Sequence, residues 1–178
     1  MKVDTSGIAQ MGQRFGSVKG KLQPALIGVV KDVGPVAMRA MKGALPGQTG
    51  LKAKVINKGL KGRMTGNAYV IQSKGGDIRL KYFGARETAA GVSAAPWNNR
   101  KVYAATFTRA GWWPDRKQKI AGGHVLRRKT GAKYPLEVVR SGLYLAEEMV
   151  KGESAEALYG TVDARFAQAI TAVVLDAI

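Results

Sequence analysis

The sequence predicts an α+β fold: an antiparallel sheet of about four to five strands, packed against a long C-terminal helix and N-terminal helices. Between residues 67 and 140, short segments alternate apolar and polar side chains with the period of two that is typical of strands. Residues 155–178 repeat apolar side chains at helical spacing instead. Because an apolar helical stripe must be covered, the sheet is its expected partner. A chain of 178 residues is long enough to bury a core as one domain.

The N-terminal part is predicted to be mostly helical. Residues 1–20 are rich in glycine and polar side chains, which fits either a weak helix or an arm that orders on assembly. A helix is expected from Leu22, with Pro24 in its first turn. The Gly-Pro pair at 34–35 should kink or briefly break it, because proline lacks an N–H donor and clashes with the preceding turn. A second helix should then end near residues 45–47.

A basic segment, LKAKVINKGLKGRM, follows at residues 51–64. Leu51, Val55 and Leu60 have helical spacing with Lys and Arg between them, while two glycines weaken the pattern. The segment is predicted to be a solvated basic helix or loop, or a stretch that faces a polyanion. Together with the preceding helices it forms a basic helical region over residues 21–64.

The predicted β region spans residues 67–140. Its first two strands, 67–74 and 77–84, should pair as a hairpin through a Gly-Gly-Asp turn. Further strands are expected at 102–109, 124–128 and 134–139, each bounded by Gly, Pro or Asn. The connections 85–101 and 110–123 look irregular, and the second is long enough to project from the sheet.

The clearest element is a C-terminal helix over residues 153–178. A short helical turn at 142–150 precedes it, and Gly152 separates the two. The apolar stripe of the helix consists of Leu158, Val162, Phe166, Ile170, Val173 and Ile178.

Charge is distributed very unevenly along the chain. Residues 1–134 carry 26 Lys and Arg against 5 Asp and Glu, a net of +21, whereas residues 135–178 carry 3 against 7, a net of −4. Like charges repel one another, so folding does not need such an excess. Nucleic acid, an anionic membrane or an acidic protein could each neutralise it. The basic residues lie between apolar segments, which predicts a charged surface on a folded body.

Composition excludes several kinds of site. The chain has no cysteine, which excludes disulfides, thiolate metal sites and cysteine nucleophiles. His124 is the single histidine, so one chain cannot build a zinc site of the usual His-rich or Cys-rich kind. The phosphate-binding pattern GxxxxGK[ST] is absent. No apolar stretch has the length of a signal peptide or a membrane span, so a soluble protein made in a cytoplasm is expected.

The sequence predicts no catalytic, metal-binding or cofactor-binding residues, and we expect that the protein is not an enzyme. His124 opens an apolar and basic segment, which favours a structural role over that of a catalytic base. The acids of the basic region stand singly beside Lys or Arg, as in ordinary surface ion pairs. The densest acidic group is interpreted as a solvated helix face that could also meet a basic face of a neighbouring copy; it contains Glu147, Glu148, Glu153 and Glu156.

The tryptophans carry two different expectations. Trp112 and Trp113 lie in the long irregular connection among Arg and Lys residues, where they could stack on bases or anchor a protein contact. We favour the protein interface. Trp97 follows Pro96 and is predicted to pack in the core. No motif for sequence reading is present, so any contact with DNA should be made to phosphates, without sequence preference.

Two segments of the β region, LKYFGARETAAGVSAAPWNNRKVYAATFTRAG (80–111) and GGHVLRRKTGAKYPLEVVRSG (122–142), together resemble the lambda-type minor tail protein Z family of tailed bacteriophages. Members of this family are also called tail completion proteins. The order of parts is similar along nearly the whole chain, from a basic helical half through a glycine-punctuated β region to a long C-terminal helix. The most specific part of the resemblance is the HVLRR strand, the basic turn and the YPLEVV segment.

The resemblance implies a virion structural protein at the head-proximal end of the tail, which assists head–tail joining and genome passage. It implies no cofactor and no active-site residues. Expected partners are the tail terminator ring, the tape measure or tail tube proteins, packaged viral DNA and further copies of the chain in a ring. A free-standing, non-sequence-specific nucleic-acid-binding protein is the alternative.

The charge pattern adds expected contact residues. Trp112 and Trp113 are assigned to a partner interface. The basic surface that would face nucleic acid or a partner is assigned to Lys52, Lys54, Lys58, Lys61, Arg63, Arg116, Lys117, Lys119, Arg127, Arg128 and Lys129.

Overall fold

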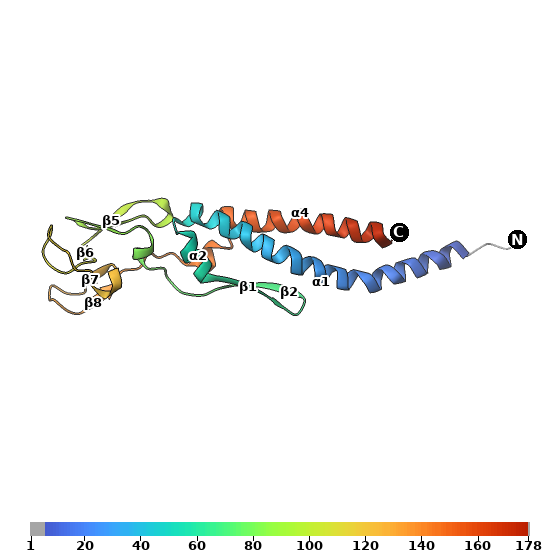
Figure 1. Cartoon of the computed structure of the whole chain (residues 1–178), viewed down its shortest axis with the longest axis horizontal. Helices are drawn as coiled ribbons and strands as arrows, with labels where there is room; N and C mark the ends of the chain where they lie inside the picture. The colour runs from blue at the N-terminus through green and yellow to red at the C-terminus, as the bar shows by residue number, and fades with distance from the viewer. Residues whose placement is uncertain (1–5, 178) are drawn as a thin grey trace. The chain divides into compact units, whose positions relative to one another are not determined.

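A computed structural model of the chain describes the backbone of residues 6–177, with the side chains of residues 23–172 and 175 (Figure 1). The predicted arm falls partly outside this range at residues 1–5, as does Ile178 at the other end. The described residues form two compact units. The first unit lies within Met1–Ala40, Gly62–Ile71 and Ala157–Ile178, and the second comprises Met41–Lys61 and Gln72–Glu156.

The α+β class is confirmed, but the single sheet of four or five strands is wrong. Within the described residues, eight strands form three small antiparallel sheets with the orders β1-β2, β3-β4-β5 and β6-β7-β8. The strands are only two to six residues long, and each pairs only within its own small sheet. The strands are β1 Leu60–Thr65, β2 Ala68–Ser73, β3 Arg86–Thr88, β4 Gly91–Ala94, β5 Lys101–Ala104, β6 Thr106–Phe107, β7 Leu126–Arg128 and β8 Leu136–Val138.

The N-terminal half is one long helix, α1 (Ser6–Thr49). The short break predicted at residues 34–35 is wrong, because α1 continues through Pro35, and the helix ends at Thr49, two residues beyond the predicted end near 45–47. Burial outweighs the cost of the lost backbone hydrogen bonds. Val33 is buried before the first proline, and Ala37, Met38, Met41 and Leu45 are buried after it. Residues 6–20, expected as a weak helix or an arm, belong to the helix.

The end of α1 is fixed by a left-handed cap. Gly50 has a φ of 75° and donates its N–H to the carbonyl of Pro46 at 2.9 Å. A Cβ at this position would lie only 2.7 Å from the carbonyl oxygen of Ala95, so only glycine fits. The hydroxyl of Thr49 donates back to the carbonyl of Leu45 at 2.6 Å inside the core.

The segment after α1 differs from its prediction. Residues 51–64 contain the short helix α2 (Ala53–Gly59) and then most of β1. β2 pairs with β1 and not with residues 77–84 as predicted, because the turn at Gly66, with a φ of 58°, closes the hairpin earlier. Residues 77–84 hold a short 3-10 helix, η1 (Leu80–Tyr82), whose Leu80 is fully buried.

The remaining predicted strands are shorter than expected. The strand proposed over 102–109 divides into β5 and β6 at Ala105, which has a φ of 56°, and its halves join different sheets. The strands expected at 124–128 and 134–139 are present as β7 and β8, which pair antiparallel through Arg127 and Glu137. The prediction of an irregular connection over 85–101 is wrong, because this segment contains β3, β4 and the 3-10 helix η2 (Pro96–Asn98); the connection 110–123 contains the 3-10 helix η3 (Ala121–Gly123).

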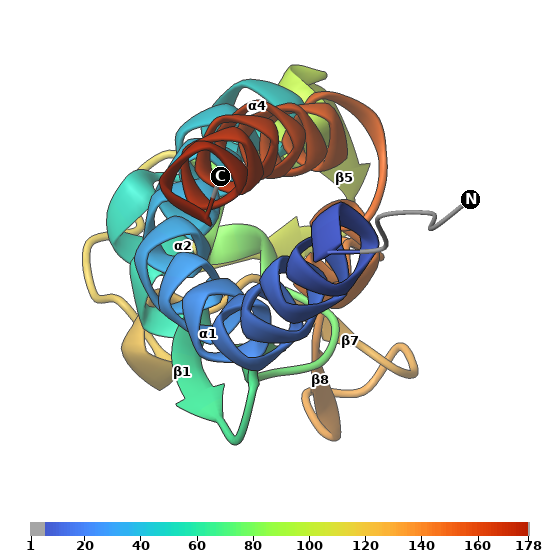
Figure 2. The ribbon, with the colours of Figure 1, turned by 90° about the vertical axis from the view of Figure 1, so that its right-hand side faces the viewer.

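The C-terminal predictions are largely confirmed. A short helix, α3 (Leu145–Glu148), precedes the long helix α4 (Gly152–Ala177). Gly152 begins α4 instead of separating the two helices. Figures 1 and 2 show α4 running alongside α1 within the first unit. The α4 stripe is only half-covered at Leu158, Val162 and Phe166, and the side chain of Val173 lies outside the described set.

The second unit contains most of the buried core. Its largest fully buried apolar side chains belong to Phe83, Met41, Leu45, Ile56 and Leu143. These residues come from α1, α2 and the long connections, so helices and loops build much of this core. None of the described helices has an apolar stretch long enough to cross a membrane.

Candidate polyanion interface

The predicted basic residues are almost all exposed. Arg116 is the exception, since it is half-buried and forms an ion pair. The structure brings some of them together in pairs, with Lys54 and Lys58 in one pocket and Arg116 and Lys119 in another. It does not gather them into one patch. The exposed residues are Lys52, Lys54, Lys58, Lys61, Arg63, Lys117, Lys119, Arg127, Arg128 and Lys129.

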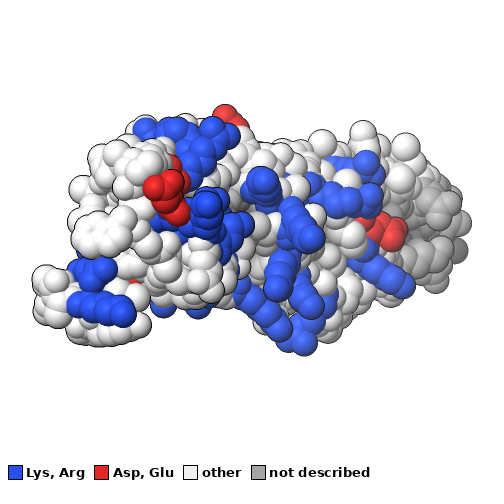
Figure 3. Space-filling view, turned by 60° about the vertical axis from the view of Figure 1, so that its left-hand side comes forward, with Lys and Arg blue, Asp and Glu red and all other residues white. Residues whose placement is uncertain are grey.

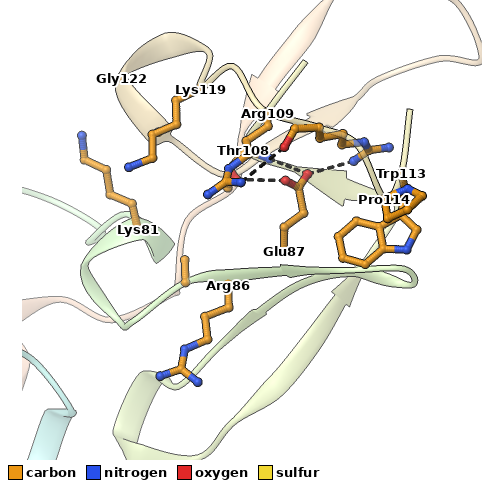
Figure 4. A pocket seen from close by; sticks show the side chains of 12 residues that line it. Lys81, Arg86, Glu87, Thr108, Arg109, Trp113, Pro114, Lys119 and Gly122 are labelled. Carbon is orange, nitrogen blue, oxygen red and sulfur yellow. Dashed lines mark hydrogen bonds and ion pairs between the residues drawn. The ribbon is translucent and has the colours of Figure 1, made fainter. Parts of the chain in front are cut away.

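Pocket A is the first of two basic pockets in the second unit, with a volume of about 620 Å³. Figure 4 shows Glu87 pointing into it from β3, with Lys81 and Lys119 on one side and Trp113 on the other. Five cationic side chains line it together with that one acid: Lys81, Arg86, Arg109, Arg116 and Lys119. Arg86 projects from β3 away from Glu87, as expected for successive residues of a strand.

Glu87 has its own partners and neutralises only one of the cations of pocket A. Its side chain is 7% exposed and pairs with Arg116 at 2.8 Å. The backbone N–H and the hydroxyl of Thr108 also donate to it, at 3.2 and 3.5 Å. Arg109 meanwhile donates to the carbonyl of Arg116 at 3.3 Å, which holds the loop after β6 across the pocket. The positive charges of Lys81, Arg109 and Lys119 therefore stay without an acidic partner among the described residues.

Pocket B is larger, about 730 Å³, and lies between α2, the loop after β2 and the start of α3. Its cations are Lys54, Lys58, Lys74, Arg79 and Arg140. Asp77 is the acid in its lining, and its carboxylate accepts hydrogen bonds from the N–H of Gly142 at 2.8 Å and the hydroxyl of Ser141 at 3.4 Å. That carboxylate therefore holds a turn, and within the described chain it forms no ion pair with the cations of the pocket.

His124 joins the two pockets. Its Nε2 lies 3.0 Å from Nζ of Lys81, which lines pocket A, and 3.1 Å from Nη1 of Arg79, which lines pocket B. Lysine and arginine can only donate, so Nε2 is the acceptor and the ring is neutral. Burial, followed by the charges of Lys81 and Arg79, lowers the pKa of His124 below its usual range. Nδ1 is buried without a hydrogen-bond partner among the described residues.

Positive charge is thus poorly compensated on this protein. Among the described residues only two ion pairs form, Arg116–Glu87 and Lys151–Glu148. Figure 3 shows Lys and Arg spread widely over the visible face, with few acidic residues between them. Charge without internal partners is available to an external polyanion.

The predicted acidic group does not stay together on one solvated face. Glu147, Glu153 and Glu156 are exposed, but Glu148 is buried with a relative exposure of 2%. Its carboxylate accepts hydrogen bonds from Gln48 at 2.8 Å and from Trp97 at 3.0 Å, and pairs with Lys151 at 3.0 Å. Burial opposes ionisation, but these partners outweigh it and lower the pKa of Glu148.

The expected contrast between the tryptophans is present only for Trp112. Trp112 is 91% exposed and Trp113, which lines pocket A, is 44% exposed. The prediction that Trp97 packs in the core is wrong: the residue is 42% exposed, and its ring N–H donates to the buried carboxylate of Glu148 at 3.0 Å.

Sequence reasoning missed the residues that complete both pockets: Lys74, Arg79, Lys81, Arg86, Arg109 and Arg140. The alternating pattern predicts that Arg79 and Lys81 lie on the polar face of one strand. The structure has the 3-10 helix η1 at this position instead, and the two residues line different pockets. One signal in the sequence pointed to them, namely the Gly pairs at 75–76 and 122–123 that border the two pockets. Tight glycine turns beside basic residues often allow an anion to approach the backbone.

No described set of three or more His, Asp and Glu side chains is close enough to hold one metal ion. Comparisons of the chain with protein-family models, curated proteins and solved structures give no significant match.

Proposed function

We propose that this chain is a structural protein of a tailed bacteriophage virion, a tail completion or minor tail protein at the head-proximal end of the tail. In this role it assists head–tail joining and the passage of the genome. The observation that carries the proposal is the uncompensated positive charge of the second unit, which suits a protein placed beside packaged DNA. The role is one of assembly and involves no catalytic step.

The two segments that resemble the tail completion family support the proposal from a second direction. Segment 80–111 provides β3, β4, β5 and β6, and segment 122–142 provides β7 and β8. Both contribute to pocket A, through Lys81, Arg86 and Arg109 from the first and the glycines 122–123 from the second. The resemblance thus falls on the part of the chain that builds the basic pocket.

Assembly into a homo-oligomeric ring fits the distribution of exposed side chains. The tail terminator and the tape measure or tube proteins are the expected neighbours, and Trp112, at 91% exposure, is the side chain best placed to be buried by one of them. In such a ring the basic pockets of each copy would face the DNA path or an acidic neighbour.

Deletion of the gene from the phage or prophage that carries it tests this role. Electron microscopy of the resulting lysate should show heads and tails that fail to join or that join without infectivity, and a plasmid copy of the gene should restore infection. Normal numbers of infectious particles, with no trace of the chain in purified wild-type virions by mass spectrometry, would contradict the proposal.

A free-standing, non-sequence-specific nucleic-acid-binding protein is the second candidate. The same two basic pockets favour it, since they need no virion to bind a phosphate backbone. This candidate predicts a monomer or dimer that binds duplex DNA at low salt and does not associate with tail proteins.

A further inference from the structure

We infer that pockets A and B form one phosphate-binding track in the second unit, joined at His124, which holds the backbone of a nucleic acid. This goes beyond the proposed function: a chain without such a track could still complete a tail, and a chain with it need not belong to a virion. The two tests can therefore fail independently.

Continuity of the track follows from three contacts at its centre. Arg79 lines pocket B, Lys81 lines pocket A, and both donate to the same Nε2 atom of His124, at 3.1 and 3.0 Å. Two cations held this close repel each other, and nothing acidic among the described residues pairs with either of them. An anion that bridges them would relieve that repulsion, so the junction is itself a favourable position for a phosphate.

The carboxylates that line the track already have hydrogen-bond or ion-pair partners. Arg86 lines pocket A, but its side chain points away from Glu87, so four cations of pocket A and five of pocket B belong to the track; of these, only Arg116 forms an ion pair with a described residue. Glu87 and Asp77 are held by Thr108, Ser141 and Gly142, so neither is free to move onto another cation. A row of cations with firmly held acids attracts a polymer of regularly spaced negative charges.

The rims of the track leave room for a sugar–phosphate chain. A Cβ added at Gly75, Gly76 or Gly122 would meet no atom within 4 Å, so open space adjoins these turns. Gly75 and Gly122 have φ angles of 120° and 63°, which directs the backbone in ways that bulkier residues resist. A nucleic acid suits these rims better than an acidic peptide, because tetrahedral phosphates match both the forked donors of arginine and the point charges of lysine.

Equilibrium binding to a 30-base-pair fluorescent DNA duplex, measured by anisotropy at several salt concentrations, tests the track. Two of its lysines are replaced in one variant, Lys74→Gln and Lys81→Gln. A control variant removes the same charge from exposed positions of the same unit that line neither pocket, with Lys101→Gln and Lys133→Gln.

The track variant should bind at least about tenfold more weakly, and the control variant should stay within about threefold of the unaltered chain. The plot of log affinity against log salt concentration should become shallower by roughly 0.9 for each lysine that contacts a phosphate. Circular dichroism verifies that both variants are folded.

Equal losses in the two variants would overturn the track, because binding would then depend on overall charge alone. Absence of binding by the unaltered chain at low salt would overturn it as well. The last measurement is binding of a poly-glutamate chain that carries the same charge as the duplex. If poly-glutamate binds more tightly than the duplex, the track binds an acidic protein and the inference is wrong.

Discussion

At the scale of single residues, His124 is the most informative position. It is the only histidine in the chain, and it accepts from two cations while its other ring nitrogen is buried. Its pKa is lowered by burial and then by Lys81 and Arg79. The neutral ring thus serves as an uncharged spacer that holds two positive side chains at the junction of the pockets.

The pKa of His124 can be measured by NMR without overlap, because a single histidine gives a single set of imidazole signals. Its pKa should lie below about 6.5, the ordinary value. Lys81→Met should raise it, since one nearby charge and one donor to Nε2 are lost, but burial should still keep it below that ordinary value. Lys101→Met is the control and should leave it unchanged. A pKa at or above the ordinary value in the unaltered chain would refute the assigned contacts.

At the scale of elements, Tyr69 fills the space between α1 and β1 in the first unit. A Cβ added at Gly34 of α1 would lie 2.7 Å from Cβ of Tyr69, and one added at Gly62 of β1 would lie 2.7 Å from Cζ of its ring. The Tyr69 hydroxyl also contacts the sulfur of Met38 at 3.4 Å. The two glycines therefore allow helix and hairpin to approach closely.

Gly34→Ala and Gly62→Ala should each lower the free energy of unfolding by about 1–3 kcal/mol, because the added methyl group overpacks the Tyr69 site. Gly28→Ala is the control within the same helix and unit, since its Cβ would meet nothing within 4 Å. The control should be neutral or stabilising by roughly 0.5–1 kcal/mol, from helix propensity alone. Urea denaturation followed by circular dichroism measures all three, and equal stability of Gly34→Ala and Gly28→Ala would contradict the packing described.

Glu148 connects three elements of the second unit. It accepts from Gln48 of α1 and Trp97 of η2, while Ser154 of α4 donates its hydroxyl to the Glu148 carbonyl at 2.6 Å. Because the folded-state pKa of Glu148 is lowered, ionisation stabilises the fold. That contribution is fully present above the unfolded-state pKa, about 4.3, and is lost as the pH falls through the folded-state pKa.

Glu148→Gln should therefore destabilise the second unit by about 1–3 kcal/mol at neutral pH, because its amide group turns a donor toward Gln48, Trp97 or Lys151. The loss of stability on acidification should also become smaller. Glu147→Gln, an exposed neighbour, is the matched control and should change neither quantity appreciably. Thermal melts at pH 7 and pH 4 make the comparison, and a Glu148→Gln chain as stable as the control would argue against this connection.

The helices and strands also show which parts of the fold the sequence pattern predicts. The periodic C-terminal segment predicted α4 correctly, because long-range packing does not oppose its local propensity. The break at Pro35 was a wrong prediction, because burial of Val33 and Ala37 on its two sides outweighs the lost hydrogen bond. The prediction of one wide sheet was also wrong. Ala105 adopts a positive φ, which the sequence pattern does not predict, and the predicted strand is divided at this residue between two sheets.

At the scale of the whole molecule, the excess of positive charge is the dominant property. The formal net charge is +17, and the described residues contain only two ion pairs. The sequence could show the excess and could select exposed cations such as Lys54, Lys58 and Lys119. The sequence could not predict the pockets. Arg79, Lys81 and Arg140 come from connections whose turns are set by tertiary contacts, such as the β-bridge between Arg79 and Arg140.

Lysine footprinting of the unaltered chain tests the phosphate track most directly. The protein is acylated briefly with and without duplex DNA at low salt, and each lysine is quantified by mass spectrometry. DNA should protect the track lysines Lys54, Lys58, Lys74, Lys81 and Lys119, while the reference lysines Lys101 and Lys133 should react as before. High salt should abolish the protection. Uniform protection of all these lysines, or protection of the reference set alone, would contradict a track through pockets A and B.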